Sequence, residues 1–203
     1  MTLVRKCCSG ALWGVLLLTF CAVHTLAFQL SRQEGDRLQA KIDAITKNGM
    51  TNPPKSGEVS VSEREANSYL AFNAKEKIPK GLTHPEVTML GKGTLAARVM
   101  VDIDEVKRRR QSRSLIDPLN YLSGQVPVNA SGILRTRGGR GQFHLRSADI
   151  GGIPLPKPLL QELVSFFSRT AENPTGIDIE APFDLPARIR EISVRTGESV
   201  VLQ

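Results

Sequence analysis

A chain of 203 residues, 40% hydrophobic and 23% charged, is long enough to bury the core of one ordinary domain, and this composition excludes a wholly disordered protein. Aromatic residues make up only 5%, so the core is expected to be aliphatic. The formal charge is +7, and without Arg5 and Lys6 it is +5, a mild excess that suits an anionic membrane surface as well as simple solubility.

The first 27 residues have the order of a secretory signal. Arg5 and Lys6 precede an apolar run at 11–23, and small residues stand at the third-last and last positions of the leader, Thr25 and Ala27, after which cleavage is expected. Since residues 11–28 are about long enough to span a bilayer, an uncleaved anchor in the inner membrane stays open as the alternative. Both interpretations predict an exported protein with a periplasmic or otherwise extracytoplasmic body.

Residues 28–57 are expected to form a helical spacer and linker. A narrow apolar stripe among many charges is typical of a solvated stalk or of a helix lying loosely on a domain. Asn48-Gly49 is expected to end the helix, and the proline and glycine residues after it indicate a linker. The folded domain is then predicted to span residues 58–203.

The domain is predicted to open with a short strand at 58–61 and a helix at 63–75. Ser62 followed by Glu65 is the pattern of a capping box, in which the two residues satisfy free amide groups at the start of a helix.

Two antiparallel hairpins are expected next, each joined by a glycine-containing turn. Their strands alternate apolar and polar residues, which places one face of each strand in the core and the other in water. The four predicted strands are 84–90, 93–103, 125–136 and 141–150. A final pair of strands at 188–195 and 199–203 closes the chain.

A basic run lies between the two hairpins. Such a run suits anionic lipid headgroups or nucleic acid, but no aromatic residue is interleaved for base stacking, so nucleic acid is not a predicted partner. A membrane-surface patch and a solvated loop are the two interpretations. The residues are Lys107, Arg108, Arg109, Arg110 and Arg113.

Residues 158–169 are predicted to form the amphipathic helix on which the domain is built. Alternate prolines precede this helix, and a proline suits its first turn because that amide has no acceptor within the helix. The apolar face is too wide to remain in water, so a sheet, a partner or a lipid must cover it. That face consists of Leu159, Leu160, Leu163, Val164, Phe166 and Phe167.

Strands outnumber helices and mostly follow one another through hairpins, which predicts an α+β fold with a curved antiparallel sheet and helices on its concave side. Catalysis is not predicted. All three cysteines, Cys7, Cys8 and Cys21, lie in the leader, and the body has only His84 and His144. The sequence therefore contains no thiolate metal site, no His-x-x-x-His pair and no Gly-x-Ser-x-Gly motif, and no cofactor is expected.

Two stretches, together with the glycine-joined strands that follow the first, resemble exported bacterial lipid-binding proteins, the phospholipid-binding family of mycobacterial mannan elongation factors, within or near the tubular lipid-binding superfamily. Residues 62–70 match a Ser-Glu helix opening with an Asn four residues after the first Glu, and residues 183–197 match a closing Leu-Pro hairpin. The resemblance implies a strongly curved sheet wrapped around one long amphipathic helix, here 158–169, with an apolar groove for an acyl chain.

Three functions remain open from the sequence. The first is a non-enzymatic envelope protein that binds or transfers a lipid or another apolar ligand in a groove between sheet and helix. The second is a membrane-tethered interaction or scaffold protein with a packed core and no ligand. The third is a hydrolase without a recognisable motif. The volume enclosed next to the apolar helix separates the first two, because a lipid needs several hundred cubic ångströms.

Overall fold

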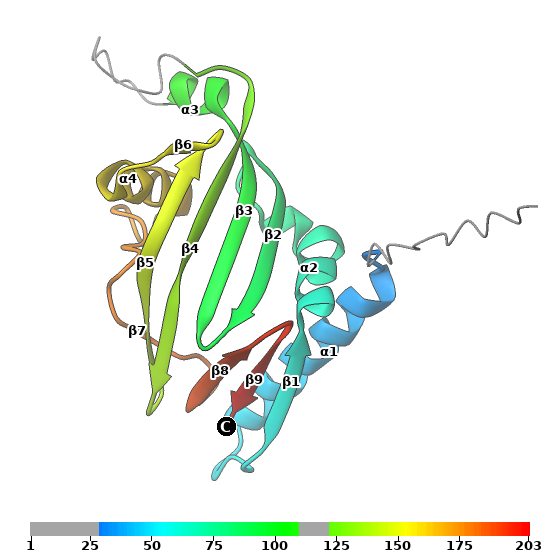
Figure 1. Ribbon diagram of the computed structural model, residues 1–203. Helices are drawn as coiled ribbons and strands as arrows, with labels where there is room; N and C mark the ends of the chain where they lie inside the picture. Colours follow the sequence, from blue (N-terminus) through cyan, green and yellow to red (C-terminus); the bar gives the residue numbers. More distant parts are fainter. Residues whose placement is uncertain (1–28, 110–121) are drawn as a thin grey trace, which may run out of the picture.

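The computed structural model describes residues 29–109 and 122–203 (Figure 1). The leader with its cysteines and its expected cleavage site lies outside the described residues, as do Arg110 and Arg113 of the basic run. In chain order the elements are α1 (Arg32–Gly49), β1 (Glu58–Ser62), α2 (Glu63–Phe72), the 3-10 helix η1 (Lys75–Lys77), β2 (Leu82–Gly91), β3 (Thr94–Asp102), α3 (Ile103–Arg109), β4 (Gln125–Arg137), β5 (Arg140–Ile150), β6 (Ile153–Pro154), α4 (Lys157–Ser168), β7 (Phe183–Asp184), β8 (Glu191–Arg195) and β9 (Glu198–Leu202).

The strands form two antiparallel sheets. The smaller sheet has the order β1-β9-β8, and the larger has the order β2-β3-β4-β5-β6, with β7 paired to β5. Helix α4 lies behind the larger sheet in Figure 1, while α1 and α2 stand beside β2 and the smaller sheet. The expected α+β class with antiparallel pairing is confirmed. Both sheets are open, however, and the described strands do not curl around a helix.

The predicted hairpins are confirmed to within two residues at their ends. Strands β4 and β5 turn at Gly138 and Gly139, whose φ angles of 58° and 83° are in the left-handed region that other residues rarely adopt. The expected final pair is β8 and β9. Strand β1 joins the other side of β9, with Glu58 opposite Leu202.

The strand predicted to run to residue 103 ends one residue earlier, where helix α3 begins. The backbone N–H of Glu105 donates to the Asp102 carboxylate at 2.9 Å, which caps the helix, and Asp104 accepts from the Gly124 amide at 3.0 Å. Ile103 and Val106 are completely buried, so the helix is held by its apolar side. The basic run was expected as a loop after a strand, but its first three residues lie on this helix.

The predicted capping box at the start of α2 is confirmed. Ser62 Oγ accepts from the Glu65 amide at 3.2 Å, and the Glu65 carboxylate accepts from the Ser62 amide at 2.8 Å. The helix itself is shorter than predicted, since it ends at Phe72 and a 3-10 turn follows.

Side chains of α2 bind the outer edge of β2. Asn67 Oδ1 accepts from the Val87 amide at 2.7 Å, and its Nδ2 donates to the Val87 carbonyl at 2.8 Å. The Met89 amide donates to the Glu63 carboxylate at 2.6 Å. An edge strand presents unpaired amides and carbonyls, and here a helix satisfies three of them in place of another strand.

Helix α1 is packed on the domain, which makes the solvated-spacer interpretation wrong. Leu38 and Ile45 are each 8% exposed, and Ile45 belongs to a hydrophobic cluster with Leu185, Ile189 and Val201. The narrow apolar stripe is therefore a buried one, and it faces the smaller sheet and the segment before β8.

Charged residues of α1 complete its contact with α2. Glu34 forms an ion pair with Arg64, and Lys41 Nζ lies 2.6 Å from the Glu65 carboxylate. The helices approach closely at Gly35, where a Cβ atom would lie 2.3 Å from Asn73 Oδ1. The sequence alone indicated a solvent-exposed face for these charged residues of α1, because their partners lie 24 and 30 residues farther along the chain.

The segment between α1 and β1 is also attached to the domain. The Asn48 side chain binds the backbone of Lys55 through both its oxygen and its nitrogen. Asn48 also donates to the Gln203 side chain, whose Nε2 donates to the carbonyls of Ile45 and Ala187 at 2.9 and 2.6 Å. Residues 29–57 therefore share hydrogen bonds with Gln203, directly after β9, and through it with the segment before β8.

We expect Leu38→Ala and Ile45→Ala each to lower the free energy of unfolding by about 2–4 kcal/mol, because each leaves a cavity in a buried contact. Urea denaturation measures this, with exposed Thr46→Ala as the control on the same helix. If all three variants match the parent, α1 is a spacer after all.

The buried ion pair of Glu65 makes stability depend on pH. Burial alone raises the pKa of this carboxyl, but the hydrogen bonds from Lys41 and Ser62 outweigh burial and hold the pKa below its ordinary value. Because the folded state has the lower pKa, the ionised group stabilises the fold above the ordinary carboxyl range. This stability is lost as the pH falls through the folded pKa.

We expect Glu65→Gln to destabilise the protein at neutral pH by about 1–3 kcal/mol and to make its stability less sensitive to acid. Denaturation midpoints between neutral and acidic pH measure both effects. Glu76→Gln, at an exposed position of η1, should leave the profile unchanged. If the stability of Glu65→Gln and of the parent fell equally steeply with decreasing pH, Glu65 would not be the source of the pH dependence.

Candidate functional site

Helix α4 packs against one end of the larger sheet. Leu160 and Leu163 are each 5% exposed and belong to a hydrophobic cluster, the upper cluster, that also draws residues from β3, α3, β4 and β5. The core members are Val101, Ile103, Val106, Val128, Ile150, Leu155, Leu160 and Leu163. The sequence left a sheet, a partner or a lipid as the cover of this apolar face, and in the described residues the larger sheet and α3 pack against it.

The other four residues predicted to line a groove pack against the same cluster. Leu159, Val164, Phe166 and Phe167 are partly buried, and the two phenylalanine rings meet edge to face at 5.1 Å. Phe167 also lies close to Gly81, the residue before β2. The structure thus brings all six predicted residues together, but as packing partners of the sheet and of α3.

Another part of the same sheet face is less well covered. The pairing register places Val87, Leu95, Ala97, Leu134 and Phe143 on the face to which α4 packs, farther along the strands. Among the described residues these five, which we call the apolar strip, belong to neither hydrophobic cluster. Ala97 is exposed and the other four are only partly buried.

The opposite face of the larger sheet carries a polar hollow of about 340 Å³. Two rows of side chains cross the strands β2, β3, β4 and β5 there, and they line most of the hollow. One row is Glu86, Arg98, Asn129 and Asp149, and the other is Thr88, Ala96, Ser131 and Ser147. Ala97 and Ala130, which lie between these rows along β3 and β4, complete the lining. The side chains of the second row are short, so the surface of the sheet is hollowed along this row.

The polar groups in this hollow largely bind one another. Asn129 Nδ2 donates to Asp149 Oδ1 at 2.8 Å, and the hydroxyl oxygens of Ser131 and Ser147 are 2.7 Å apart. Neither serine has a histidine next to it in the register, since His144 pairs with Ile133. Nucleophilic catalysis needs a base within hydrogen-bond reach of the hydroxyl, and no such base is paired with these serines.

The described part of the predicted membrane-surface run has partners within the chain. Lys107 Nζ donates to the Leu122 carbonyl, and Arg108 pairs with Glu105 one turn earlier on α3. That carboxylate raises the pKa of Arg108 above its ordinary value. Arg109 ends the helix, and the membrane role of Arg110 and Arg113 stays a prediction outside the described residues.

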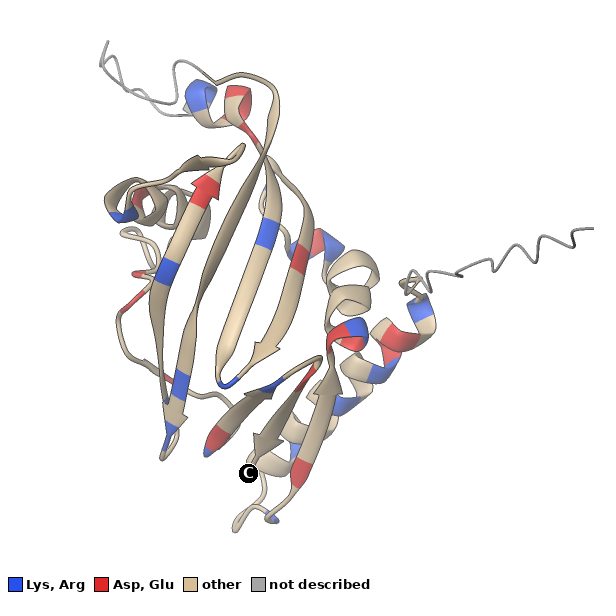
Figure 2. Ribbon diagram, in the orientation of Figure 1, with Lys and Arg blue, Asp and Glu red and all other residues tan. Residues whose placement is uncertain are grey.

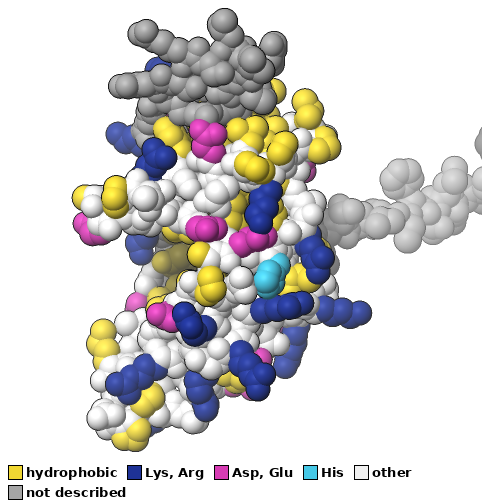
Figure 3. Space-filling model, turned by 90° about the vertical axis from the view of Figure 1, so that its left-hand side faces the viewer, with side chains coloured by type: hydrophobic (Ala, Val, Ile, Leu, Met, Phe, Trp, Pro, Cys, Tyr) yellow, Lys and Arg dark blue, Asp and Glu magenta, His cyan; other side chains and the backbone are white. Residues whose placement is uncertain are grey.

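A second group of arginines gathers at the opposite end of the larger sheet. Figure 2 marks Lys and Arg positions in blue at the tips of β4 and β5, and Figure 3 shows several Lys and Arg side chains over the lower half of one face. Sequence reasoning missed this group because its members come from a turn and from a distant segment. The exposed members are Arg135, Arg137, Arg140, Arg188 and Arg190.

Within residues 29–109 and 122–203, no group of three His, Cys, Asp or Glu side chains is placed to hold a metal ion. No helix in those two ranges is both long and apolar enough to cross a membrane. A scan against protein-family models finds no match, and a search of curated proteins finds none either.

The packing of Leu163 leads to a direct prediction. We expect Leu163→Ala to lower the free energy of unfolding by about 2–5 kcal/mol, and Leu163→Trp to unfold the domain, because Leu163 is buried in the upper cluster and an indole ring there would overpack it. Circular dichroism and urea melts measure both. Glu162→Ala, at an exposed position of the same helix, serves as the control. A stably folded Leu163→Trp would instead place this residue beside an open space.

Proposed function

We propose that this chain is a non-enzymatic lipid-binding protein of the cell envelope, exported by residues 1–27, and that an acyl chain lies on the apolar strip. The strip carries the proposal, since it is a partly exposed apolar surface that belongs to neither hydrophobic cluster, on a sheet whose upper end is packed. Exposed apolar surface of this kind in a soluble domain is typical of a ligand or partner site.

The arrangement of the strip also suits a chain-like ligand. Its residues come from four adjacent strands, and small Ala97 at its centre leaves room above the sheet. The upper cluster lies at one side of it, so a ligand there would extend the hydrophobic core. In this proposal α4 bounds the site and its six apolar residues support it, whereas the sequence had suggested them as the lining.

The scaffold alternative draws on a different observation. Dense packing beneath α4, together with the polar hollow on the opposite face, is compatible with a protein partner bound to the row of Glu86, Arg98, Asn129 and Asp149. This surface is polar and its groups are hydrogen-bonded to one another, so an acyl chain lying on it would bury polar groups at a cost in free energy. The two functions therefore predict binding at opposite faces of β3.

Adjacent alanines on β3 separate these functions. We expect Ala97→Trp to weaken uptake of a fluorescent fatty acyl probe by about tenfold or more, because the ring fills the centre of the strip; tenfold corresponds to about 1.4 kcal/mol. Probe fluorescence titration measures the affinity, and the melting temperature confirms folding.

The matched control is Ala96→Trp, which adds the same ring on the opposite face, in the polar hollow. Its acyl probe affinity should stay within about twofold of the parent value. If both tryptophans act alike, or if the parent binds no probe, the lipid-binding proposal fails.

A further inference from the structure

The end of the domain at the β4–β5 turn has an unusual charge balance. Residues 135–140 contain three arginines and no acidic residue, while residues 183–191 contain two arginines with Asp184 and Glu191. All five arginines are exposed, and these two segments together carry three excess positive charges. We call this surface the basic end.

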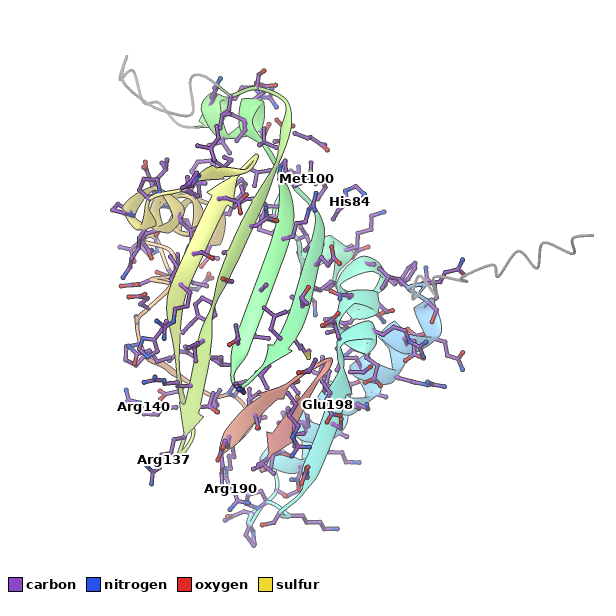
Figure 4. The ribbon with its side chains drawn as sticks, in the orientation of Figure 1. His84, Met100, Arg137, Arg140, Arg190 and Glu198 are labelled. Atoms are coloured by element: carbon purple, nitrogen blue, oxygen red, sulfur yellow. The ribbon has the colours of Figure 1, made fainter. Side chains whose placement is uncertain are left out.

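Backbone hydrogen bonds hold the two segments together. The Gly139 amide donates to the Arg190 carbonyl at 2.9 Å, and the Leu185 amide donates to the Gly139 carbonyl at 2.7 Å. Figure 4 shows Arg137 and Arg140 at the hairpin tip and Arg190 by the start of β8, at the opposite end of the molecule from His84 and Met100. The charges are thus brought together by the fold.

The arginines at the basic end have weak partners inside the chain. Arg140 lies 3.5 Å from Asp184, but both side chains are strongly exposed, at 72% and 87%. Arg188 donates to the Thr51 carbonyl at 3.3 Å and Arg190 donates to the Gln203 carbonyl. The Thr51 carbonyl orients the Arg188 guanidinium without neutralising it, and the other donors of that guanidinium can still bind an anion.

Two apolar side chains are exposed at the same end. Phe183 is 43% exposed with its ring against Gly141, where a Cβ atom would lie 2.6 Å from that ring. Met50 is 78% exposed, and the residue after it accepts the hydrogen bond from Arg188. Arginines around exposed apolar side chains match the boundary of a bilayer, where phosphates lie next to acyl chains.

We infer that the basic end docks on an anionic lipid bilayer, with guanidinium groups on headgroup phosphates and Phe183 and Met50 at the acyl boundary. This inference names the membrane partner of the proposed lipid-binding protein and rests on that function. It places the docking surface at the end of the larger sheet opposite α3, away from the basic run predicted from sequence.

The test compares two full-length triple variants that lose the same charge. One is Arg137→Gln, Arg140→Gln, Arg188→Gln, and the other is Lys75→Gln, Lys77→Gln, Lys80→Gln at exposed positions near η1. Flotation measures binding to vesicles of phosphatidylcholine with phosphatidylglycerol and to vesicles of phosphatidylcholine alone. The ratio of the two affinities gives the preference for anionic lipid. Residues 1–27, which include the basic Arg5 and Lys6, are the same in every variant, so their contribution cancels when the variants are compared with the parent.

We expect the arginine triple to reduce the anionic preference on the order of a hundredfold at low salt, at about fivefold per residue, and the lysine triple to change it only slightly. Added salt should erase the difference, because exposed charges are screened beyond about 10 Å at 0.1 M. Met50→Ser should weaken binding by a factor that salt does not alter.

Equal losses in both triples would show that net charge alone attracts the protein, and would overturn the inference. An unchanged arginine triple would overturn it too. Uptake of the acyl probe, measured on the same samples in solution, distinguishes the two proposals. Intact probe uptake with no vesicle preference in the parent removes the docking surface and leaves lipid binding in place.

Discussion

The hydrogen bonds between α2 and the outer edge of β2 determine the arrangement of the N-terminal half of the domain. Asn67 and Glu63 bind three backbone groups of that edge, so α2 is fixed to the larger sheet by hydrogen bonds as well as by packing. Helix α1 packs on α2, and strand β1 runs directly into α2. Because β1 also pairs with β9, the contact between α2 and β2 fixes the position of the smaller sheet as well. The Ser-Glu pattern with its following Asn, which suggested a lipid-binding family, thus has a structural role in this chain.

Local features were predictable from sequence because their causes lie within a few residues. Glycine turns, strand alternation and the Ser62 capping box each involve neighbours in the chain, and the structure contains them all. The end of β3 was misjudged because Ile103 continues the alternation while Asp102 caps a helix. Helix α1 was misjudged since its buried surface depends on partners that no local pattern indicates, among them Gln203.

The candidate sites show the same limit. The apolar face of α4 was recognised from its spacing, but whether a sheet or a ligand covers Leu163 depends on the positions of β3, α3 and β5. The apolar strip exists only through the register of four strands, and a shift by one residue would turn Ala97 to the opposite face. The basic end likewise joins segments about fifty residues apart, which a charge run in sequence cannot reveal.

The pairing of β1 with β9 has a consequence for how the chain folds. Glu58 pairs with Leu202, and the Asn48 side chain meets Gln203 across 155 residues of sequence. During synthesis, α1 and β1 leave the ribosome long before their partners do. Until those partners are made, the apolar stripe of α1 stays exposed to solvent. Contacts of such large sequence separation favour slow folding, because the long intervening chain must be closed before they form, and they leave a long period in which a chaperone can bind the chain.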